Sequence, residues 1–497
     1  VLGMFSYGTF KSWSYERSKQ RNVIKELGLD NLIKPPKIIP SSSGGNRNRL
    51  RLGIIGFGDR ANQLASGLGF IHASTVENLK NRGNLESFMA QEDLNVELTG
   101  ICEVFDLHAQ RGMEIALNGL RVNGENVAKY KVKRYLTYQE MLEDENIDAV
   151  IIATPEHLHA QMTIDAVNAG KHVYCEKSFT RTEKELYDAY DAVKNSNVVF
   201  QLGHQVTQNV IYQQAKEIID QNILGKINLI ETTTNRNYPG GAWIRHVDSA
   251  GNPKPGDEKS IDWKQWLGSR PYVPFSIDRY YNWTKFFDYS TGLLGQLFTH
   301  EFDAINQVLN IGIPRSVVSS GGIYFWKDNR DIPDVLHSVF EYPDKDLTLV
   351  YSASLASSRQ RPRLIMGHDA SMELGGSLKI TFDYGSTQYK KQIEEGIVDT
   401  NNPMITVSPG TGAVDATSSA TERYYTSRGL TSTYMNGRNI DVTHLHLKDW
   451  LDCIRNGGTP KVDIEKAFEE GVAVMMAHKS YIEKRRVEWD PVARRII

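Results

Sequence analysis

Two side chains of this sequence are candidates for proton transfer, Lys177 and His300. A lysine normally has a pKa near 10.4, so Lys177 would accept a proton at neutral pH only if its pKa fell by about 3 units. Burial beside a cation lowers the pKa of a lysine in this way, whereas a charged Lys177 would polarise a substrate oxygen. Histidine titrates near neutrality without help, so His300 is the expected proton acceptor.

A glycine-rich motif could hold a phosphate-bearing ligand. It follows a short apolar run and has the spacing G-x-G-x-x-A, in the residues Gly56-Phe57-Gly58-Asp59-Arg60-Ala61. The first glycine permits a tight turn, the second lets the backbone approach a pyrophosphate, and the small Ala61 lets a helix pack on the strand. Free N–H groups at the start of that helix would face the phosphates. The motif therefore predicts a dinucleotide-binding strand, turn and helix.

An acidic residue indicates which dinucleotide binds. Glu103 follows the predicted strand 96–102. A carboxylate at this position accepts hydrogen bonds from the ribose hydroxyls and repels a 2′-phosphate, which favours NAD over NADP. Its distance from the glycines exceeds the usual spacing of ~20 residues. We therefore expect an insertion between about Gly69 and Asp93.

The elements that position these residues alternate between apolar runs and helical segments. The run 149–153 leads into Thr154 and Pro155, which suit the N-cap and the first position of a helix. The run 171–175 brings Lys177 to the carboxyl edge of the predicted sheet. Strands that alternate with helices predict a doubly wound α/β Rossmann domain, whose ligands bind at that edge.

Composition and charge exclude several classes of protein. The 57 Lys and Arg stand against 60 Asp and Glu, a net charge of −3, whereas nucleic-acid binders carry a basic surplus. No run of about 18 apolar residues predicts a membrane span. The three cysteines are too few and too widely spaced for a disulfide framework, and no histidine or cysteine spacing predicts a metal. We therefore expect no nucleic acid, no membrane span and no metal site.

The first 49 residues differ from the rest of the chain. Residues 34–40 are rich in proline and predict an extended segment, and residues 41–45 predict a flexible linker. We expect an arm that packs on a neighbouring subunit, with a disordered tail as the alternative. The apolar start followed by basic residues leaves an exported, periplasmic location and a cytoplasmic location both open.

These motifs together resemble the Gfo/Idh/MocA oxidoreductases, the family of glucose–fructose oxidoreductase and inositol dehydrogenase. The resemblance covers nearly everything after residue 50, and the tail is similar to the exported, sugar-active branch. Its marks are Gly56-Phe57-Gly58, Thr154-Pro155-Glu156-His157-Leu158-His159, Cys175-Glu176-Lys177, Gly203-His204-Gln205, Asp262-Trp263, Trp266-Leu267-Gly268 and Gly292 to Asp303. The resemblance implies a second, α+β domain with an open, mostly antiparallel sheet that covers the nicotinamide. It also implies a homo-dimer or homo-tetramer.

The expected organisation has three parts. Residues 1–49 form the arm, residues 50–205 form the Rossmann NAD-binding domain, and residues 206–441 form the sheet domain for substrate binding and oligomerisation. The resemblance implies that C-terminal helices at about 442–485 pack back on the Rossmann domain.

The motifs and the resemblance together name the site residues. Lys177 and His300 would be catalytic. The expected NAD-binding residues are Gly56, Phe57, Gly58, Asp59, Arg60, Glu103, Thr154, Pro155, His157, His159, Glu176, Lys177 and Gln205. The expected substrate-binding residues are Lys177, His204, Arg236, Trp283, Gln296, His300 and Asp303. Two positions depart from the family: Ser178 replaces a proline, and Gln296 replaces an aspartate, so it can bond a sugar hydroxyl but cannot act as a base.

The implied activity is the NAD-dependent oxidation, or the reverse reduction, of a secondary hydroxyl of a sugar or glycoside, possibly at C3. Relatives of this fold also cleave glycosides through a transient ketone and return the cofactor unchanged, so a redox-neutral glycoside hydrolase is an alternative. A third interpretation is a non-catalytic sugar sensor that keeps a bound nucleotide, which only Gln296 supports.

Overall fold

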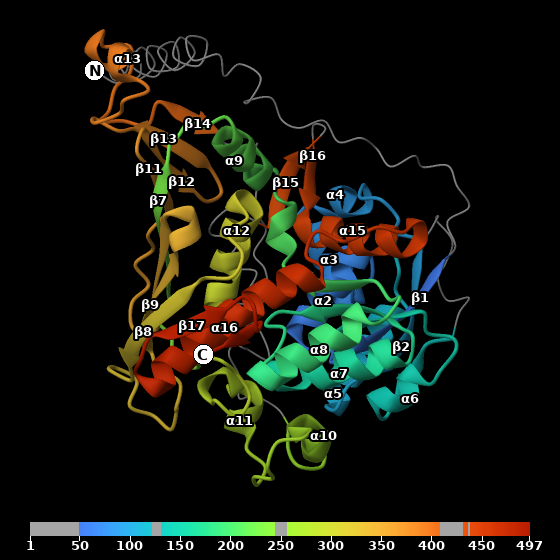
Figure 1. Ribbon diagram of the computed structural model, residues 1–497. Coiled ribbons are helices and arrows are strands. Elements are labelled where there is room, and N and C mark those ends of the chain that lie inside the picture. Colours follow the sequence, from blue (N-terminus) through green and yellow to red (C-terminus); the bar gives the residue numbers. More distant parts are fainter. Residues whose placement is uncertain (1–48, 122–130, 244–255, 408–430, 436–437) are drawn as a thin grey trace, which may run out of the picture.

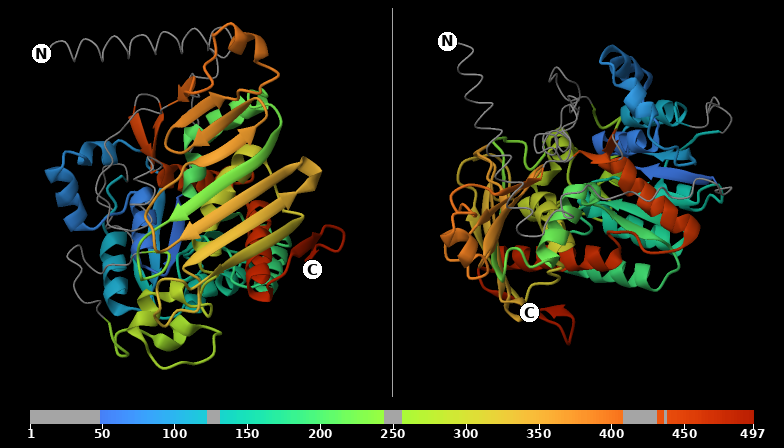
Figure 2. Two further views of the ribbon diagram at one scale, coloured as in Figure 1. Left: turned by 90° about the vertical axis from the view of Figure 1, so that its left-hand side faces the viewer. Right: turned by 90° about the horizontal axis from the view of Figure 1, so that it is seen from above.

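The computed structural model describes residues 49–121, 131–243, 256–407, 431–435 and 438–497 (Figure 1). Apart from Arg49, the predicted arm lies outside this part of the chain. The described residues form a parallel sheet and a larger, mostly antiparallel sheet, with helices between the larger sheet and the N-terminal domain (Figure 2). The predicted fold class is confirmed.

The first sheet has six parallel strands in the order β3-β2-β1-β4-β5-β6. They are β1 (Leu50–Ile55), β2 (Val96–Cys102), β3 (Lys133–Tyr135), β4 (Ala149–Ile152), β5 (His172–Glu176) and β6 (Phe200–Gly203). β4 is buried throughout, because helices cover both faces of such a sheet. The strand order reverses between β1 and β4, and ligands of doubly wound sheets bind at the carboxyl ends beside this point.

Seven helices surround this sheet within the described residues. They are α2 (Asp59–Leu68), α3 (Ala73–Asn81), α4 (Leu85–Met89), α5 (Asp106–Ala116), α6 (Tyr138–Leu142), α7 (Glu156–Asn168) and α8 (Glu183–Lys194). The expected insertion after Gly69 is the pair α3 and α4. α7 starts one residue later than the sequence predicted, because Pro155 has extended backbone angles and is itself the N-cap.

The second sheet has ten strands in the order β14-β13-β12-β11-β7-β10-β9-β8-β17-β18. They are β7 (Ile227–Asn235), β8 (Ser316–Gly322), β9 (Val335–Tyr342), β10 (Leu347–Ser354), β11 (Arg363–Gly367), β12 (Ala370–Leu374), β13 (Leu378–Phe382), β14 (Ile405–Val407), β17 (Val487–Asp490) and β18 (Arg495–Ile496). Only β7 and β10 pair in parallel among them. Burial alternates along β10, so helices cover one face of this sheet.

Helices from both halves of the chain connect the two sheets. They are α9 (Val210–Asp220), α12 (Thr299–Leu309), α15 (Val442–Asn456) and α16 (Ile464–Glu483), with the 3-10 helix η1 (Gln205–Gln208) and the π-helical turn η3 (Leu294–Phe298). α15 packs on the nucleotide domain, where Leu447 and Trp450 join its core. α16 lies between the domains, because it contacts β8 through Ser480 and α8 at Gly471. The smaller elements are β15 (Ser432–Met435), β16 (Arg438–Asp441), α13 (Lys390–Glu394) and the 3-10 helix η4 (Pro343–Lys345).

Residues 256–290, here called the cover segment, cross from the second domain to the nucleotide domain. The segment contains α10 (Trp263–Leu267), α11 (Ile277–Tyr281) and the 3-10 helix η2 (Trp283–Lys285), at the lower edge of Figure 1. Backbone hydrogen bonds join it to the end of β2, from Asp106 N to Ser260 O at 2.9 Å and from Asp262 N to Val104 O at 2.9 Å. A small core of its own includes Trp266. The cover segment is therefore packed against the carboxyl edge of the parallel sheet.

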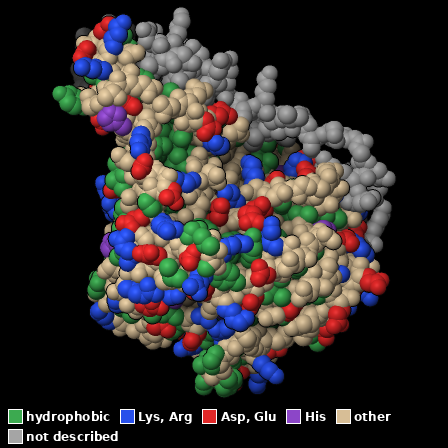
Figure 3. Space-filling model, in the orientation of Figure 1, with side chains coloured by type: hydrophobic (Ala, Val, Ile, Leu, Met, Phe, Trp, Pro, Cys, Tyr) green, Lys and Arg blue, Asp and Glu red, His purple; other side chains and the backbone are tan. Residues whose placement is uncertain are grey.

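The surface carries charges of both signs. On the face in Figure 3, Lys and Arg side chains are interspersed with Asp and Glu. None of the helices in the described residues is both long enough and apolar enough to cross a membrane.

Candidate active site

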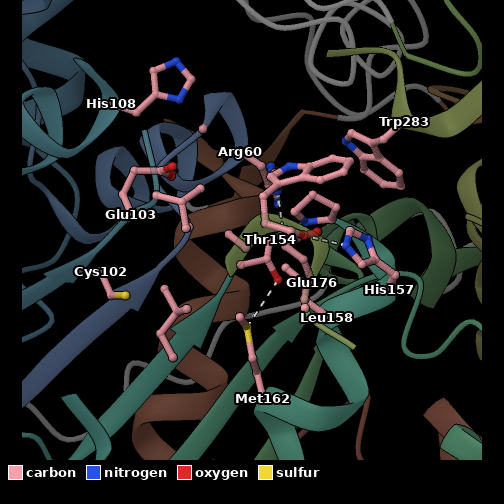
Figure 4. Close-up of a pocket in the computed structure, with 18 of the residues that line it drawn as sticks. Arg60, Cys102, Glu103, His108, Thr154, His157, Leu158, Met162, Glu176 and Trp283 are labelled. Carbon is pink, nitrogen blue, oxygen red and sulfur yellow. Dashed lines mark hydrogen bonds and ion pairs between the residues drawn. The ribbon is translucent and has the colours of Figure 1, made fainter. Parts of the chain in front are cut away.

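A cleft of about 460 Å³ lies at the carboxyl ends of β1, β2, β4 and β5, beneath the cover segment. This volume is typical of sites for small ligands. In Figure 4, Glu103 and His108 lie on one side of the cleft, and His157 and Trp283 lie on the other. The cleft is therefore bounded by both domains, at the switch point of the parallel sheet.

The glycine turn forms one lip of the cleft. Gly56 has a φ of +81°, a conformation that residues with a side chain rarely adopt. An added Cβ at Gly58 would meet no atom within 4 Å, so the backbone there is open to a ligand. Phe57 lies away from the cleft wall, because its ring packs on Gly112, where an added Cβ would be 2.8 Å from it. Asp59 and Arg60 begin α2 and line the cleft.

Glu103 stands directly beside this turn. Its carboxylate accepts hydrogen bonds from Phe57 N at 2.5 Å and from Phe105 N at 2.8 Å. Burial raises the pKa of Glu103, while these hydrogen bonds and Arg111 oppose the rise. The acid is thus fixed at the end of β2 next to the glycine turn, where a ribose would lie against it.

The loop after β4 lines the middle of the cleft. Thr154, Pro155 and His157 lie on the wall. His157 Nε2 lies 2.8 Å from the carbonyl oxygen of Trp266, so this histidine also holds α10 in place. Burial lowers the pKa of His157 to about 3. His159 lies behind the wall, because its two ring nitrogens face the carbonyl oxygens of Ser178 (2.6 Å) and Thr154 (2.8 Å).

Glu176 connects the glycine turn to the loop that carries Lys177. Its Oε1 accepts hydrogen bonds from Arg60 Nε at 2.8 Å and from Gln205 Nε2 at 2.8 Å. All three side chains line the cleft. This network fixes the end of β5, from which Lys177 extends.

Lys177 meets residues of the second domain inside the cleft. Its Nζ lies 3.3 Å from the backbone oxygen of Gln296, 3.5 Å from the side-chain oxygen of Gln296 and 4.8 Å from the ring centre of Trp243. The peptide bond from Lys177 to Ser178 is cis. Burial lowers the pKa of Lys177 to about 8, against the charges of Glu176 and Glu156, which raise it.

His300 lines the cleft near Lys177, on the first turn of α12. Burial, followed by the positive charge of Lys177, lowers its pKa well below 6.5. The imidazole of His300 is therefore neutral at physiological pH. This finding differs from the expectation that His300 titrates near neutrality, and it makes Lys177 the side chain whose pKa lies nearer to neutral pH.

Two predicted substrate-binding residues lie behind His300. His204 pairs with Glu470 of α16, with Nε2 and Oε2 2.8 Å apart, and its ring centre is 5.3 Å from that of His300. Burial raises the pKa of Asp303 to about 7. Neither His204 nor Asp303 lines the cleft. Their predicted direct contact with substrate is replaced by a position in the buried layer that supports His300.

The remaining predicted residues lie at the domain boundary. Trp283 and Gln296 line the cleft, as predicted, whereas Arg236 does not. The guanidinium of Arg236 stacks on the ring of Trp243 at 3.9 Å and donates a hydrogen bond to Ala242 O at 2.5 Å. Arg236 therefore supports Trp243, and this tryptophan is the residue that reaches the cleft.

Sequence reasoning did not assign several wall residues. They include Gln63, His108, Arg111, Gln161, Trp243, Trp266, Tyr280 and Tyr281. Four of them are aromatic, and the high density of aromatic residues between 230 and 290 was the feature of the sequence that could have indicated them. His108 and Arg111 lie on one face of α5, directly after Glu103, and had no motif to mark them.

The arrangement fits NAD. The open backbone at Gly58, the N-terminus of α2 and the fixed carboxylate of Glu103 suit the pyrophosphate and ribose of a dinucleotide. In the part of the chain that the structure describes, no three His, Cys, Asp or Glu side chains are grouped as metal ligands would be.

Two family models match the chain. The model described as "Oxidoreductase family, NAD-binding Rossmann fold" matches residues 51–204, and "Oxidoreductase family, C-terminal alpha/beta domain" matches residues 262–489. Together they cover well over half of the chain.

Curated relatives match over shorter stretches. Levoglucosan dehydrogenase from Pseudarthrobacter phenanthrenivorans is 31% identical over 37% of this chain and 41% of the relative. scyllo-Inositol 2-dehydrogenase (NAD(+)) from Bacillus subtilis is 37% identical over 22% of this chain and 32% of the relative. 2,7-Anhydro-N-acetylneuraminate hydratase from Escherichia coli is 31% identical over 23% of this chain and 31% of the relative. Each match thus spans less than half the length of the relative.

Solved structures share the fold over both domains. A levoglucosan dehydrogenase in complex with NADH and levoglucosan has a TM-score of 0.56 at 18% identity, over 88% of this chain and 99% of that chain. An NAD-binding protein from Listeria innocua has a TM-score of 0.54 at 16% identity, over 88% and 96% of the two chains. The family matches over both domains, with the doubly wound sheet and its glycine turn, show that this chain belongs to the Gfo/Idh/MocA oxidoreductase family and that its N-terminal domain is the family's NAD-binding Rossmann fold.

Proposed function

We propose that the protein is an NAD-dependent dehydrogenase that oxidises, or reversibly reduces, a secondary hydroxyl of a sugar or glycoside, possibly at C3. The observation that carries this proposal is the position of Lys177, with a lowered pKa, in the same cleft as the glycine turn and Glu103. Two matched relatives are named as dehydrogenases of levoglucosan and scyllo-inositol, which supports a carbohydrate substrate.

The side chains of the cleft have complementary tasks in this reaction. NAD, when bound, supplies the acceptor for the hydride. Lys177 takes the proton of the reacting hydroxyl, because a base works best when its pKa lies near the working pH. The neutral imidazole of His300 and the amide of Gln296 hydrogen-bond sugar hydroxyls. The rings of Trp243 and Trp283 offer apolar faces for a sugar ring.

The test is to incubate the full chain and NAD with a panel of free sugars and glycosides. Formation of NADH, followed by its absorbance, is expected with at least one of them. A matched Lys177→Ala variant should bind NAD but form no NADH. If the wild-type protein forms NADH with none of the panel, the proposal is refuted.

A second candidate function is the redox-neutral cleavage of a glycoside. One matched relative is named as a hydratase of an anhydro sugar, a reaction that adds water and carries out no net oxidation. The same panel separates the two functions when release of the aglycone is measured beside NADH. Aglycone release without net NADH would select the hydrolase. If neither NADH nor aglycone forms, the remaining function is that of a nucleotide-bound sensor.

A further inference from the structure

A buried carboxylate lies behind Gln296, the position at which the family usually has an acid. Glu156, the first residue of α7, has no solvent exposure. It accepts hydrogen bonds from Ser290 Oγ at 3.0 Å, Thr291 N at 3.0 Å, Thr291 Oγ1 at 2.6 Å and Gln296 Nε2 at 2.7 Å. Burial raises the pKa of Glu156, while these hydrogen bonds and the helix N-terminus favour the charged form and oppose the rise. Glu156 does not line the cleft, so it acts on a ligand only through its neighbours.

The partners of Gln296 fix which way its amide points. The NH2 group donates to Glu156 at 2.7 Å, and the oxygen accepts from Trp243 Nε1 at 3.0 Å and faces Lys177 Nζ at 3.5 Å. An indole N–H and an ammonium are donors only, and an ionised carboxylate is an acceptor only. If the amide were flipped, its NH2 group would face the N–H of Trp243, and its oxygen would face the carboxylate of Glu156. The carboxylate therefore holds the amide in one orientation.

We propose that Glu156 is a positioning residue for the reaction: through the amide of Gln296 it presents an oxygen acceptor to Lys177, and this carboxylate–amide pair replaces the single carboxylate usual in the family. The inference rests on the proposed function for its meaning in catalysis. The contacts of Glu156 connect α7 of the nucleotide domain to residues 290–296 of the second domain. Glu156 therefore orients the amide oxygen of Gln296 toward Lys177 only when the second domain is packed on the nucleotide domain.

The arrangement has a measurable consequence for the charge of Lys177. The ionisable groups whose charges act on it include Glu176, Glu156, Arg60, Arg236, His300, His204 and His159. Glu156 favours the ammonium, both by its charge and by the oriented amide oxygen. Removing its charge should therefore lower the pKa of Lys177, and placing a carboxylate at position 296 should raise it.

The decisive measurement is the pH dependence of acylation of the Lys177 amine, read by mass spectrometry on the full chain without sugar. Acetic anhydride reacts with the neutral amine, so the midpoint reports the pKa of Lys177. We expect Glu156→Gln to lower the midpoint. Adding Gln296→Glu to that variant should raise the midpoint by about 1 unit, because a carboxylate then faces the ammonium directly. Asp346→Asn, the same loss of a carboxylate charge at an exposed residue outside the cleft, should leave it unchanged.

Turnover provides the second readout. At a pH above all the midpoints, where Lys177 is neutral in each protein, Glu156→Gln should lower kcat by about tenfold, because the Gln296 oxygen no longer holds the amine in place. The KM for NAD should change little, and the double substitution should recover most of the loss. Equal midpoints and kcat values in Glu156→Gln and Asp346→Asn, or no rise on adding Gln296→Glu, would overturn the inference. Should Glu156→Gln fail to fold, Gln296→Met removes the same acceptor and must lower the midpoint too. If no sugar is oxidised by the wild type, the proposed function fails, whereas the labelling result still decides the role of Glu156.

Discussion

Around Lys177 the cleft offers an amide oxygen and a backbone oxygen from Gln296 and the indole face of Trp243. Burial lowers the pKa of Lys177 to about 8 in these surroundings, whereas burial makes His300 a much weaker base than free histidine. A lysine with this pKa can release and accept protons near neutral pH. The bound, positively charged nicotinamide would lower the value further.

Replacing Lys177 with arginine tests this assignment. Arg keeps the positive charge but does not deprotonate, so Lys177→Arg should lose at least about 100-fold in kcat while still binding NADH. In the wild type, kcat/KM for sugar oxidation should rise with pH through a midpoint near or below 8. The measurement is a pH profile of both proteins. A variant with nearly normal turnover would show that Lys177 acts as a charge and not as a base.

We expect Glu103 to determine the choice between NAD and NADP. Glu103→Gln keeps an acceptor for the hydrogen bonds from Phe57 N and Phe105 N but removes the charge that repels a 2′-phosphate. The ratio of the Kd for NADP to the Kd for NAD should fall by about tenfold. Fluorescence titration with both cofactors measures it. Asp106→Asn, the same charge change at an exposed residue outside the cleft, is the control and should leave the ratio unchanged.

Residues that follow strand ends could be placed from the sequence, because all parallel strands deliver their carboxyl ends to one edge. Glu103, Lys177 and Gln205 line the cleft for this reason. Asp303 does not line the cleft, since it lies almost one turn further along α12 than His300 and is buried there. The partner of His204 could not be predicted, because Glu470 comes from a helix 266 residues away in the chain.

At the scale of elements, local signals predicted strands β1, β2, β4 and β5 of the nucleotide domain, whereas the short β3 had no such signal. Thr182 and Glu185 form a capping box at the start of α8, with both reciprocal hydrogen bonds. The ten-stranded sheet was predicted only through the family resemblance, because its strand pairs join distant segments such as β8 and β17. The return of the cover segment onto β2 had no signal in the sequence, since it depends on contacts that form only in the folded molecule.

Gly268 tests how the cover segment is held over the cleft. It ends α10 with a φ of +59°, and an added Cβ would lie 2.5 Å from Leu158 Cδ2. We expect Gly268→Ala to lower the free energy of unfolding by about 2–4 kcal/mol, from backbone strain and overpacking, and to weaken NAD binding.

Gly396 provides a matched control for this prediction. Its φ is +70°, and an added Cβ would meet nothing within 4 Å. Gly396→Ala should cost only about 1–2 kcal/mol and leave the Kd for NAD unchanged. Urea denaturation and fluorescence titration measure the two quantities. Equal Kd values for NAD in both variants would show that α10 does not hold the cofactor.

On the scale of the whole molecule, α16 joins the two domains at the site. It contacts β8 of the large sheet and α8 of the nucleotide domain, and Glu470 reaches His204 at the end of β6. A second buried pair, Arg363 with Glu301 at 2.9 Å, ties the large sheet to α12, which carries His300. The layer behind Lys177 and His300 is thus built from segments that lie far apart in the chain.

The pair of His204 and Glu470 should make the stability of the whole molecule depend on pH. Burial lowers the pKa of His204, but the charges of Glu470 and Asp303 outweigh it, so the net shift is upward. A histidine whose pKa is raised by folding stabilises the protein fully below its unfolded value, near 6.5, and this contribution disappears as the pH rises through the folded value. Glu470→Gln should therefore lower the free energy of unfolding by about 3 kcal/mol near pH 6 and by clearly less near pH 9.

Chemical denaturation at both pH values measures the difference. The control is Asp346→Asn, in the exposed pair with Lys226, which should change the free energy of unfolding by less than about 1 kcal/mol at either pH. A loss in Glu470→Gln that is equal at both pH values would mean that the charge of His204 does not change between them, which would contradict this prediction.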